Sequence, residues 1–279
     1  MKKFISALCA ASLGASLFAY DIISDAQIKG SATSMTRTDF SIISKFGEYF
    51  RTPSTKYTYT LNSSGKATES AELTARDALV NKISNTYDAT GRLTAQVCLD
   101  AEGSVIWKSS VNYKNGKKTD VSEFGRDGGL KSKIIYTYTG DNLSEETVYN
   151  ADGYLVEKAI YKYDDKGRLS VLDSYFDDGS LAQESVYTYT EEGKKDTITY
   201  YDGHGKLSSK CIFRYAANGS LSEVTTYGAD NQTTSRQLVK YDNKGNVSRL
   251  TTYSVARKFG TTVNEMTDMS EFTYGYDEK

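Results

Sequence analysis

Residues 161–189 read YKYDDKGRLSVLDSYFDDGSLAQESVYTY, and this stretch decides the fold. It contains two glycines, Gly167 and Gly179, each of which ends an aspartate-rich segment, DDKG or FDDG. Asp side chains can hydrogen-bond the backbone ahead of them, and Gly then takes the left-handed conformation that closes the turn. The step between these glycines leaves room for a strand of about seven to nine residues. The stretch therefore predicts tight β-hairpins.

The same pattern recurs through most of the chain with a period of 26 residues. Two tyrosine series keep this step: Tyr149, Tyr175, Tyr201, Tyr227, Tyr253, and Tyr163, Tyr189, Tyr215, Tyr241. The glycine series Gly167, Gly193, Gly219, Gly245 keeps it too, and it continues backwards through Asn142, Gly116, Gly91 and Gly65 in steps of 25 or 26. In a second glycine series, Asn231 replaces Gly, as Asn best can where φ is positive. A fixed period of this length indicates a repeat protein, here with about eight repeats over residues 57–253.

The repeat assigns the chain to the all-β class. Proline removes a hydrogen-bond donor from a sheet, so a composition of one Pro, 23 Tyr and 22 Gly fits a chain of paired strands and tight turns. We expect an elongated, curved antiparallel meander of tandem 26-residue β-hairpin repeats, with about sixteen strands. Because so long a sheet must twist and coil, a spiral and an open barrel both remain open.

Side-chain alternation predicts which residues share a face of the sheet. We expect Tyr163 to face Leu169 and Tyr161 to face Val171 around one turn, and Tyr175 to face Leu181 across the next. We expect one aliphatic residue per strand on the opposite face: Ile160, Leu172, Val186, Ile198, Ile212, Val224, Leu238 and Leu250.

The N-terminal residues 1–19 predict export. Lys2 and Lys3 precede an apolar stretch at residues 4–18, which is typical of a cleaved secretory signal peptide and too short for a comfortable membrane span. We expect a location in the periplasm, on the outer surface or outside the cell, with membrane association at most peripheral. Lipidation of Cys9 is a minor alternative.

Both ends of the array need covering, because an exposed edge strand templates aggregation. Residues 20–56 are predicted to form an N-terminal capping segment. Within it, Phe40, Ile43, Phe46 and Phe50 lie at near-helical spacing and favour a capping helix over residues 39–51. Residues 254–279 are predicted to form a C-terminal capping loop, over residues 257–270, and a final strand around FTYGY.

The repeat also resembles a known family. The segments NTYDATGRLTAQ (residues 85–96), YKYDDKGRLSVLDSYFDDGSLAQESVYTY and VKYDNKGNVSRL (residues 239–250) resemble the YD repeats of Rhs and teneurin-type proteins, in which a Tyr-Asp pair and two free positions precede Gly-Arg-Leu. In that family long arrays form hollow β-shells around a toxin or a folded cargo, and some members contribute to adhesion. Here the array is short and some copies lose the motif, as in YTEEGKKD, which weakens the implication of encapsulation. Variant MORN repeats, suggested by residues 111–133, are the second choice.

Catalysis finds little support in the sequence. The net charge of −2 gives no footprint for nucleic acid. The single histidine, His204, lies in a predicted turn, and the cysteines lack metal spacing, so we expect no enzyme, no metal and no cofactor. Cys98 and Cys211 lie more than four repeats apart and are expected to be unpaired.

The abundance of tyrosine suggests a binding function. Aromatic hydroxyls repeated along a sheet suit sugar rings or protein surfaces. The hypothesis is a non-catalytic binding or adhesion module that takes a surface glycan or protein on Tyr161, Tyr163, Tyr187, Tyr189 and Tyr215. The alternative is a purely structural envelope or shell protein, in which Tyr serves hairpin packing. An outer-membrane β-barrel is disfavoured, because charged residues interrupt both faces. The oligomeric state is left open.

Overall fold

The computed structural model describes residues 28–258 and 260–276. The predicted signal peptide therefore lies outside the described residues. The first nine strands are β1 (Ala32–Lys45), β2 (Glu48–Leu61), β3 (Ala67–Thr74), β4 (Leu79–Tyr87), β5 (Leu93–Asp100), β6 (Val105–Lys114), β7 (Lys117–Gly125), β8 (Leu130–Thr139) and β9 (Asn142–Asn150).

The remaining strands continue the same alternation of strand and turn. They are β10 (Leu155–Tyr163), β11 (Leu169–Phe176), β12 (Leu181–Tyr189), β13 (Lys195–Asp202), β14 (Leu207–Tyr215), β15 (Leu221–Gly228), β16 (Thr233–Tyr241), β17 (Val247–Lys258) and β18 (Thr261–Tyr276). No helix able to span a bilayer occurs in the part of the chain that the structure describes.

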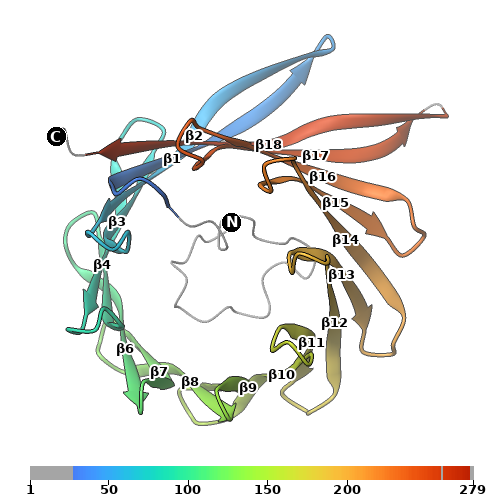
Figure 1. Ribbon diagram of the computed structural model, residues 1–279. Coiled ribbons are helices and arrows are strands. Elements are labelled where there is room, and N and C mark those ends of the chain that lie inside the picture. Colours follow the sequence, from blue (N-terminus) through green and yellow to red (C-terminus); the bar gives the residue numbers. More distant parts are fainter. Residues whose placement is uncertain (1–27, 259, 277–279) are drawn as a thin grey trace. The chain divides into compact units, whose positions relative to one another are not determined.

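The described strands form one antiparallel sheet of 18 strands, in which neighbours along the chain lie side by side (Figure 1). β1 pairs with β2 on one side and with β18 on the other, so that the first and last strands meet. The expected all-β antiparallel meander is confirmed. Its strand order is circular, as in a closed β-barrel, and differs from both the spiral and the open barrel that the sequence suggested. Closure removes the two edges that would template aggregation.

The repeat turns explain why the hairpins form. In the turn after β10, the amide of Asp164 donates to the carbonyl of Arg168 at 2.8 Å, and the amide of Gly167 donates to the carbonyl of Asp164 at 2.9 Å. Gly167 has a φ of 75°. In the second glycine series, Gly205 has a φ of 75° and Asn231, 26 residues later, has a φ of 61°. The substitution of Asn for Gly in this series thus has the expected conformational reason.

A β-bulge beside the turn that follows β10 corrects the predicted assignment of faces. Tyr163 lies opposite Leu169, as expected, but the bulge skips one residue, so that Tyr161 lies opposite Leu172 and not Val171. Tyr175 lies opposite Leu181, again as expected. The face that carries Tyr161, here called the tyrosine face, therefore includes Leu172. This aliphatic residue was predicted on the opposite face, and the prediction was wrong because a bulge inverts the alternation after it.

Two further members of the aliphatic series follow Leu172. Ile198 lies opposite Tyr187, and Val224 lies opposite Gln237, which shares the face of Tyr241. Both are almost fully buried, at 1% exposure each. Ile160, in contrast, lies opposite Asp173 on the other face, as predicted.

The capping helix predicted over residues 39–51 is absent. These residues belong to β1 and β2, which pair from Ser34 opposite Thr60 to Lys45 opposite Glu48. The near-helical spacing of the aromatic residues is overridden by a two-residue turn at Phe46 and Gly47, where both residues have positive φ.

The C-terminal capping loop predicted over residues 257–270 is also wrong. β18 begins at Thr261 and is continuous to Tyr276. It pairs with β17 from Thr261 to Glu271 and with β1 from Asp268 to Tyr276, so the described residues of the predicted loop lie mainly in paired strands.

The sheet divides into two compact units, which are described separately. The first comprises Thr86–Val97 and Val105–Cys211 among the described residues. Its core is a row of aliphatic residues across β6, β7, β8 and β9, in which Val111, Val121, Ile134 and Val148 lie opposite one another in turn. This row packs with Leu93 and Tyr136 on the tyrosine face.

The second unit comprises the described parts of Asp25–Asn85, Cys98–Ser104 and Ile212–Lys279. It contains the joint between β1 and β18. There the carboxylate of Asp39 accepts hydrogen bonds from Arg37 Nε and from Ser270 Oγ, both at 2.6 Å. The guanidinium of Arg37 lies over the rings of Tyr57 and Phe272, at 5.6 and 6.0 Å. The joint is therefore held by a mostly buried polar network as well as by the backbone ladder.

The two cysteines of the described residues, Cys98 and Cys211, are buried. Cys98 lies in β5 at 3% exposure and Cys211 lies in β14 at 0%. Burial raises the pKa of the Cys98 thiol to about 11, with Glu72 and Asp100 adding to the shift. Their unpaired state stays a prediction, for which thiol labelling of denatured, unreduced protein is the measurement.

Replacement of Gly203 by Ala is expected to destabilise the protein by about 1–3 kcal/mol, because overpacking forces the backbone to move. A Cβ atom at this position would lie 2.0 Å from the main-chain oxygen of Leu181. The matched control is Gly125→Ala, whose Cβ would meet the movable Lys131 Cε at 2.9 Å. Urea denaturation of both variants measures the difference. Equal midpoints for the two variants would contradict the close approach at Gly203.

Candidate functional site

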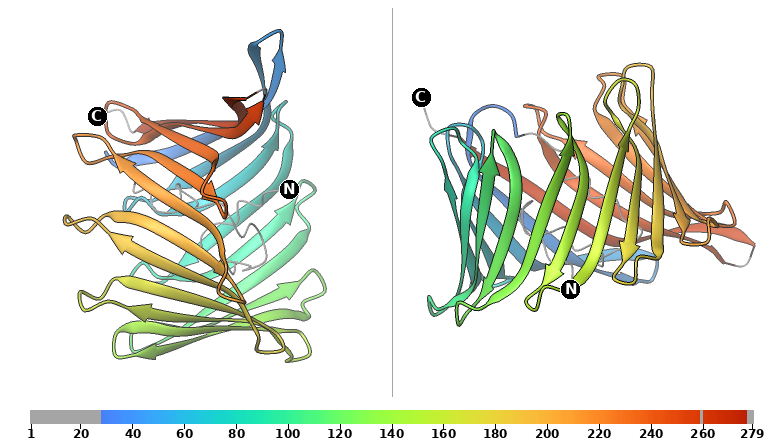
Figure 2. Two further views of the ribbon diagram at one scale, coloured as in Figure 1. Left: turned by 90° about the vertical axis from the view of Figure 1, so that its right-hand side faces the viewer. Right: turned by 90° about the horizontal axis from the view of Figure 1, so that it is seen from below.

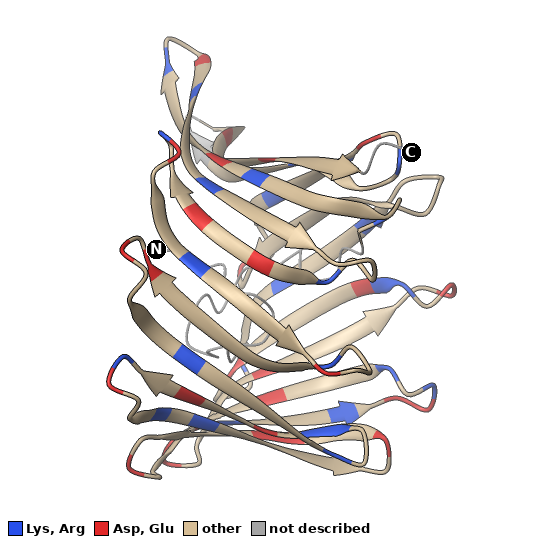
Figure 3. Ribbon diagram, turned by 90° about the vertical axis from the view of Figure 1, so that its left-hand side faces the viewer, with Lys and Arg blue, Asp and Glu red and all other residues tan. Residues whose placement is uncertain are grey.

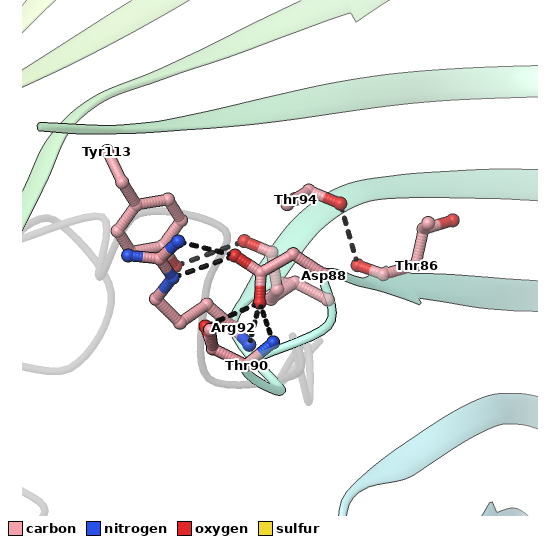
Figure 4. Close-up of polar contacts among 7 residues, drawn as sticks. Thr86, Asp88, Thr90, Arg92, Thr94 and Tyr113 are labelled. Carbon is pink, nitrogen blue, oxygen red and sulfur yellow. Dashed lines mark hydrogen bonds and ion pairs between the residues drawn. The ribbon is translucent and has the colours of Figure 1, made fainter. Parts of the chain in front are cut away.

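The turn between β4 and β5 shows what the YD motif does (Figure 4). Asp88 Oδ1 accepts hydrogen bonds from the backbone amides of Thr90 and Arg92, both at 2.9 Å, and from the Thr90 hydroxyl at 2.7 Å. Asp88 Oδ2 accepts from Arg92 Nε at 2.8 Å. The hydrogen bond from the Arg92 amide is the main reason that the pKa of Asp88 lies well below its usual range. The aspartate therefore closes the turn and fixes the arginine.

The fixed arginine covers a tyrosine of the next hairpin. The guanidinium of Arg92 lies 4.9 Å from the ring centroid of Tyr113, whose hydroxyl donates to the carbonyl of Leu93 at 3.0 Å (Figure 4). The same arrangement recurs in the turn between β10 and β11. Arg168 Nε donates to Asp164 at 2.8 Å, and its guanidinium lies 4.3 Å from the ring of Tyr189. In both places the Asp, Arg and Leu of the motif together hold one tyrosine.

The hydroxyl contact of that tyrosine, here called the tyrosine clasp, is seen at Tyr113, Tyr163, Tyr189, Tyr241 and Tyr274. In each, the phenol at the end of one strand donates to the main-chain oxygen at the start of the preceding strand. The pairs are Tyr113 with Leu93 (3.0 Å), Tyr163 with Leu143 (2.9 Å), Tyr189 with Leu169 (2.7 Å), Tyr241 with Leu221 (2.9 Å) and Tyr274 with Val247 (2.9 Å). Successive turns at one end of the sheet are therefore linked to each other through side chains.

The five tyrosines predicted as a binding site are all half-buried. The hydroxyls of Tyr163 and Tyr189 are clasps, and the hydroxyl of Tyr161 donates to Glu146 Oε2 at 3.3 Å. Tyr187 lies on β12, opposite Ile198, in the first unit. Tyr215 is the last residue of β14 and belongs to the second unit. The hydroxyls of Tyr161, Tyr163 and Tyr189 are thus bonded within the protein, and the use of the five tyrosines as a binding site stays a prediction.

The strongest electrostatic feature of this face is a buried carboxylate that the sequence analysis missed. Glu146 lies on β9 between Tyr136 on one neighbouring strand and Ala159 on the other, and it is 9% exposed. Burial raises its pKa, against an opposing effect of the Lys118 ammonium. Burial likewise lowers the pKa of Lys118, whose Nζ lies 3.9 Å from the ring centroid of Tyr136. The middle of the tyrosine face in this unit is therefore charged and poorly hydrated.

A signal in the sequence could have revealed Glu146. Leu172, Ile198 and Val224 follow one another at the 26-residue period, and Glu146 stands at the same position one repeat before Leu172. A carboxylate in the slot where three later repeats place an aliphatic residue is unusual in a packed sheet. The error in assigning faces hid it, because that series was expected on the other side.

The polar side chains of the repeat turns at Asp88, Asp164 and Asp202 are engaged in hydrogen bonds of the turns. No group of three potential metal ligands occurs among residues 28–258 and 260–276. The amide of His204 donates to Asp202 Oδ1 at 2.9 Å, as part of a repeat turn. The aspartates of the repeats are used as turn acceptors, as at Asp88 and Asp164.

Charged residues occur on both faces of the sheet. On the face opposite the tyrosines, Lys158 pairs with Glu145 at 2.8 Å and Lys162 pairs with Asp173 at 2.7 Å, in each case between neighbouring strands. The tyrosine face carries Glu146 and Lys118. Figure 3 shows acidic and basic positions along the strands as well as in the turns.

Comparisons with known proteins bear on the fold. No family model matches the chain, and no curated protein matches it. The chain is similar to the crystal structure of a porin-like protein from Bacteroides uniformis, with 16% identity and a TM-score of 0.50 over 88% of this chain and 98% of that one. This likeness supports a β-barrel fold class and nothing further.

Two other solved structures resemble the chain less. One is a porin-like protein from Bacteroides vulgatus, with 10% identity and a TM-score of 0.36 over 71% of this chain and 95% of that one. The other is the Photorhabdus luminescens Tc holotoxin pore, with 15% identity and a TM-score of 0.36 over 77% of this chain and 12% of that one.

Removal of one clasp hydroxyl should cost stability without disturbing the ring. For Tyr189→Phe we expect a loss of about 1 kcal/mol in the free energy of unfolding, since the carbonyl of Leu169 loses a donor. The control is Tyr154→Phe. Because Tyr154 is 71% exposed, loss of its hydroxyl should leave the free energy of unfolding unchanged. Urea denaturation measures both. An equally small effect in the two variants would show that the clasp at Tyr189 contributes nothing.

The buried carboxylate gives a pH-dependent prediction. Because the folded-state pKa of Glu146 is raised, its contribution favours folding below the unfolded-state pKa and is lost as the pH rises through the folded-state pKa. Glu146→Gln removes this charge while keeping an acceptor for Tyr161. We expect the variant to be more stable than the natural protein at pH 7, with the gap narrowing as the pH is lowered toward the ordinary carboxyl range. Thermal unfolding at several pH values measures it, and a gap that widens in acid would contradict the assignment.

Proposed function

We propose that the chain is an exported, non-catalytic structural protein of the cell envelope, built as a closed sheet of YD-type hairpin repeats. The single observation that carries this proposal is the tyrosine clasp. Five phenol hydroxyls are bonded to main-chain oxygens of the preceding strand, with distances of 2.7 to 3.0 Å. These tyrosines link hairpins, which is the role expected of them in a structural protein.

Assignment to the YD-repeat type rests on the motif and its contacts. In residues 87–93 and 163–169, the Asp, the Gly, the Arg and the Leu each have a defined place in the turn or in the clasp. Tyr163 also forms a clasp of its own. Most of the motif is therefore explained by folding alone. A family whose signature is structural is compatible with an envelope or shell component.

A pore in the outer membrane is not the function we propose. The lipid-facing side of such a barrel carries an apolar band about 25 Å tall. In the first unit, one face carries the ion pairs of Lys158 with Glu145 and of Lys162 with Asp173, and the other carries Glu146. Neither face of this unit provides a continuous apolar band.

A second candidate function is the multivalent binding of a surface glycan or protein by the tyrosine face. The observation in its favour is that the rings of Tyr161, Tyr163, Tyr187, Tyr189 and Tyr215 keep partial exposure. Such a face could hold a ligand through several weak contacts. The structural proposal and this one predict different results in the same experiment.

That experiment combines stability and capture. A variant with Tyr163, Tyr189 and Tyr215 all changed to Leu is compared with the natural mature protein by urea denaturation and by capture on arrays of surface glycans and envelope proteins. The structural proposal predicts a lower unfolding midpoint and the same capture profile. A variant with unchanged stability that loses a capture signal of the natural protein would overturn it in favour of the binding face.

A further inference from the structure

The hairpin of β1 and β2 extends beyond the sheet that carries it. β1 is in register with β18 only as far as Ser41, and β2 is in register with β3 only from Thr55 onward. Residues 42–51 therefore pair with each other, ending at Lys45 opposite Glu48. Figure 2 shows this hairpin, in blue, reaching past the neighbouring strands. An isolated two-stranded ribbon is marginal in water, so its composition is informative.

The end of this hairpin is apolar and exposed. Phe46 is fully exposed, at 104%, while Ile43 and Phe50 are 49% and 51% exposed. Ile43 lies directly opposite Phe50, so that the two side chains share one face of the ribbon. We call Ile43, Phe46 and Phe50 the hairpin tip. Exposure of three large apolar side chains to water is unfavourable, and such a patch commonly marks an interaction site.

The turn itself is occupied by a residue that fits it poorly. Phe46 has a φ of 54° and Gly47 a φ of 81°, the pattern of a two-residue hairpin turn that favours Asn-Gly. The chain uses Asn-Gly elsewhere in the same setting, at Asn115 and Gly116, with φ values of 52° and 79°. A bulky residue at positive φ is a strained choice, which points to a use for the ring.

A bracing contact positions the tip. The hydroxyl of Tyr49 donates to the carbonyl of Asn264 at 3.1 Å and accepts from the amide of Met266 at 3.2 Å, both on β18. The hairpin is thereby tied to the adjacent long strand just behind the tip. The sequence also repeats the triplet Lys-Phe-Gly of residues 45–47 at residues 258–260, between β17 and β18.

The shape of this feature selects the kind of partner. A stable protein–protein interface buries about 800 Å² on each partner, which three side chains at the end of a ribbon do not supply. A bilayer interface needs no complementary surface, and it favours a few aromatic and aliphatic side chains inserted at the boundary of the acyl chains. Lys45 and Glu48 flank the turn and are exposed, as residues at headgroup level would be.

We propose that the hairpin tip is a membrane-interface anchor, in which Phe46, with Ile43 and Phe50, inserts into the surface of a phospholipid bilayer. The charged faces of the sheet stay in water. This inference uses residues that take no part in the tyrosine clasps, and it stands or falls apart from the proposed structural function.

The test is flotation of the mature protein, residues 20–279, with vesicles of phosphatidylethanolamine and phosphatidylglycerol. The natural protein should float with the vesicles, and high salt should leave most of it bound, because apolar insertion is not screened. Phe46→Asn should reduce the partition coefficient about tenfold, the usual order for loss of one buried aromatic side chain. This variant adopts the favoured Asn-Gly turn, so misfolding does not explain a loss.

The matched control is Phe176→Asn. Phe176 is 56% exposed and directly precedes a repeat turn. The equivalent position one repeat earlier is Asn150, so Asn fits this position. The change should leave flotation unaltered. Failure of the natural protein to float, equal flotation of Phe46→Asn, or an equal loss in Phe176→Asn would each overturn the proposal. Sedimentation that shows an oligomer broken by Phe46→Asn would overturn it too, in favour of docking to a second copy.

Discussion

The structure depends on one interaction, the hydrogen bond from a tyrosine hydroxyl at the end of one strand to the main-chain oxygen at the start of the preceding strand. At Tyr113 and Tyr189 the turn aspartate also fixes an arginine over the ring. Each of these tyrosines therefore has a guanidinium over its ring and a hydrogen bond from its hydroxyl. Each clasp joins two turns that lie at the same end of the sheet. A meander whose core is thin in aliphatic residues thus gains a second set of links beside its backbone ladder.

Closure of the sheet complements these links. The strand β1 has hydrogen-bonded partners on both sides, and Arg37, Asp39 and Ser270 add a polar network where β1 meets β18. A closed sheet needs no terminal caps, which is why the segments predicted to cap the array are strands. Two hairpins, β1 with β2 and β17 with β18, have long strands that extend past the sheet. The hairpin of β1 and β2 carries the exposed hairpin tip.

The sequence predicted the fold class, the repeat and the turns, because Asp, Asn and Gly act locally and at a fixed period. It failed where the outcome depends on register. Bulges beside the turns moved Leu172 and its series to the tyrosine face, and with them the position of Glu146. The clasps were equally out of reach, since a phenol 20 residues from its acceptor, as in Tyr189 and Leu169, depends on how two hairpins align. For the candidate site, the sequence singled out Tyr161, Tyr163 and Tyr189 but not the partners of their hydroxyls, and their use as a binding site stays a prediction.

The central claim is that the tyrosines of this face serve the fold, and titration of the phenols in the folded protein, followed by ultraviolet absorbance, tests it most directly. Burial raises the pKa of Tyr113, Tyr161, Tyr163, Tyr241 and Tyr274 above the usual value. The account predicts two phases, with exposed phenols ionising in the ordinary range and the packed set ionising only at higher pH, together with unfolding. A single reversible phase in the ordinary range, with the sheet intact, would show these hydroxyls to be open to solvent and would contradict the account.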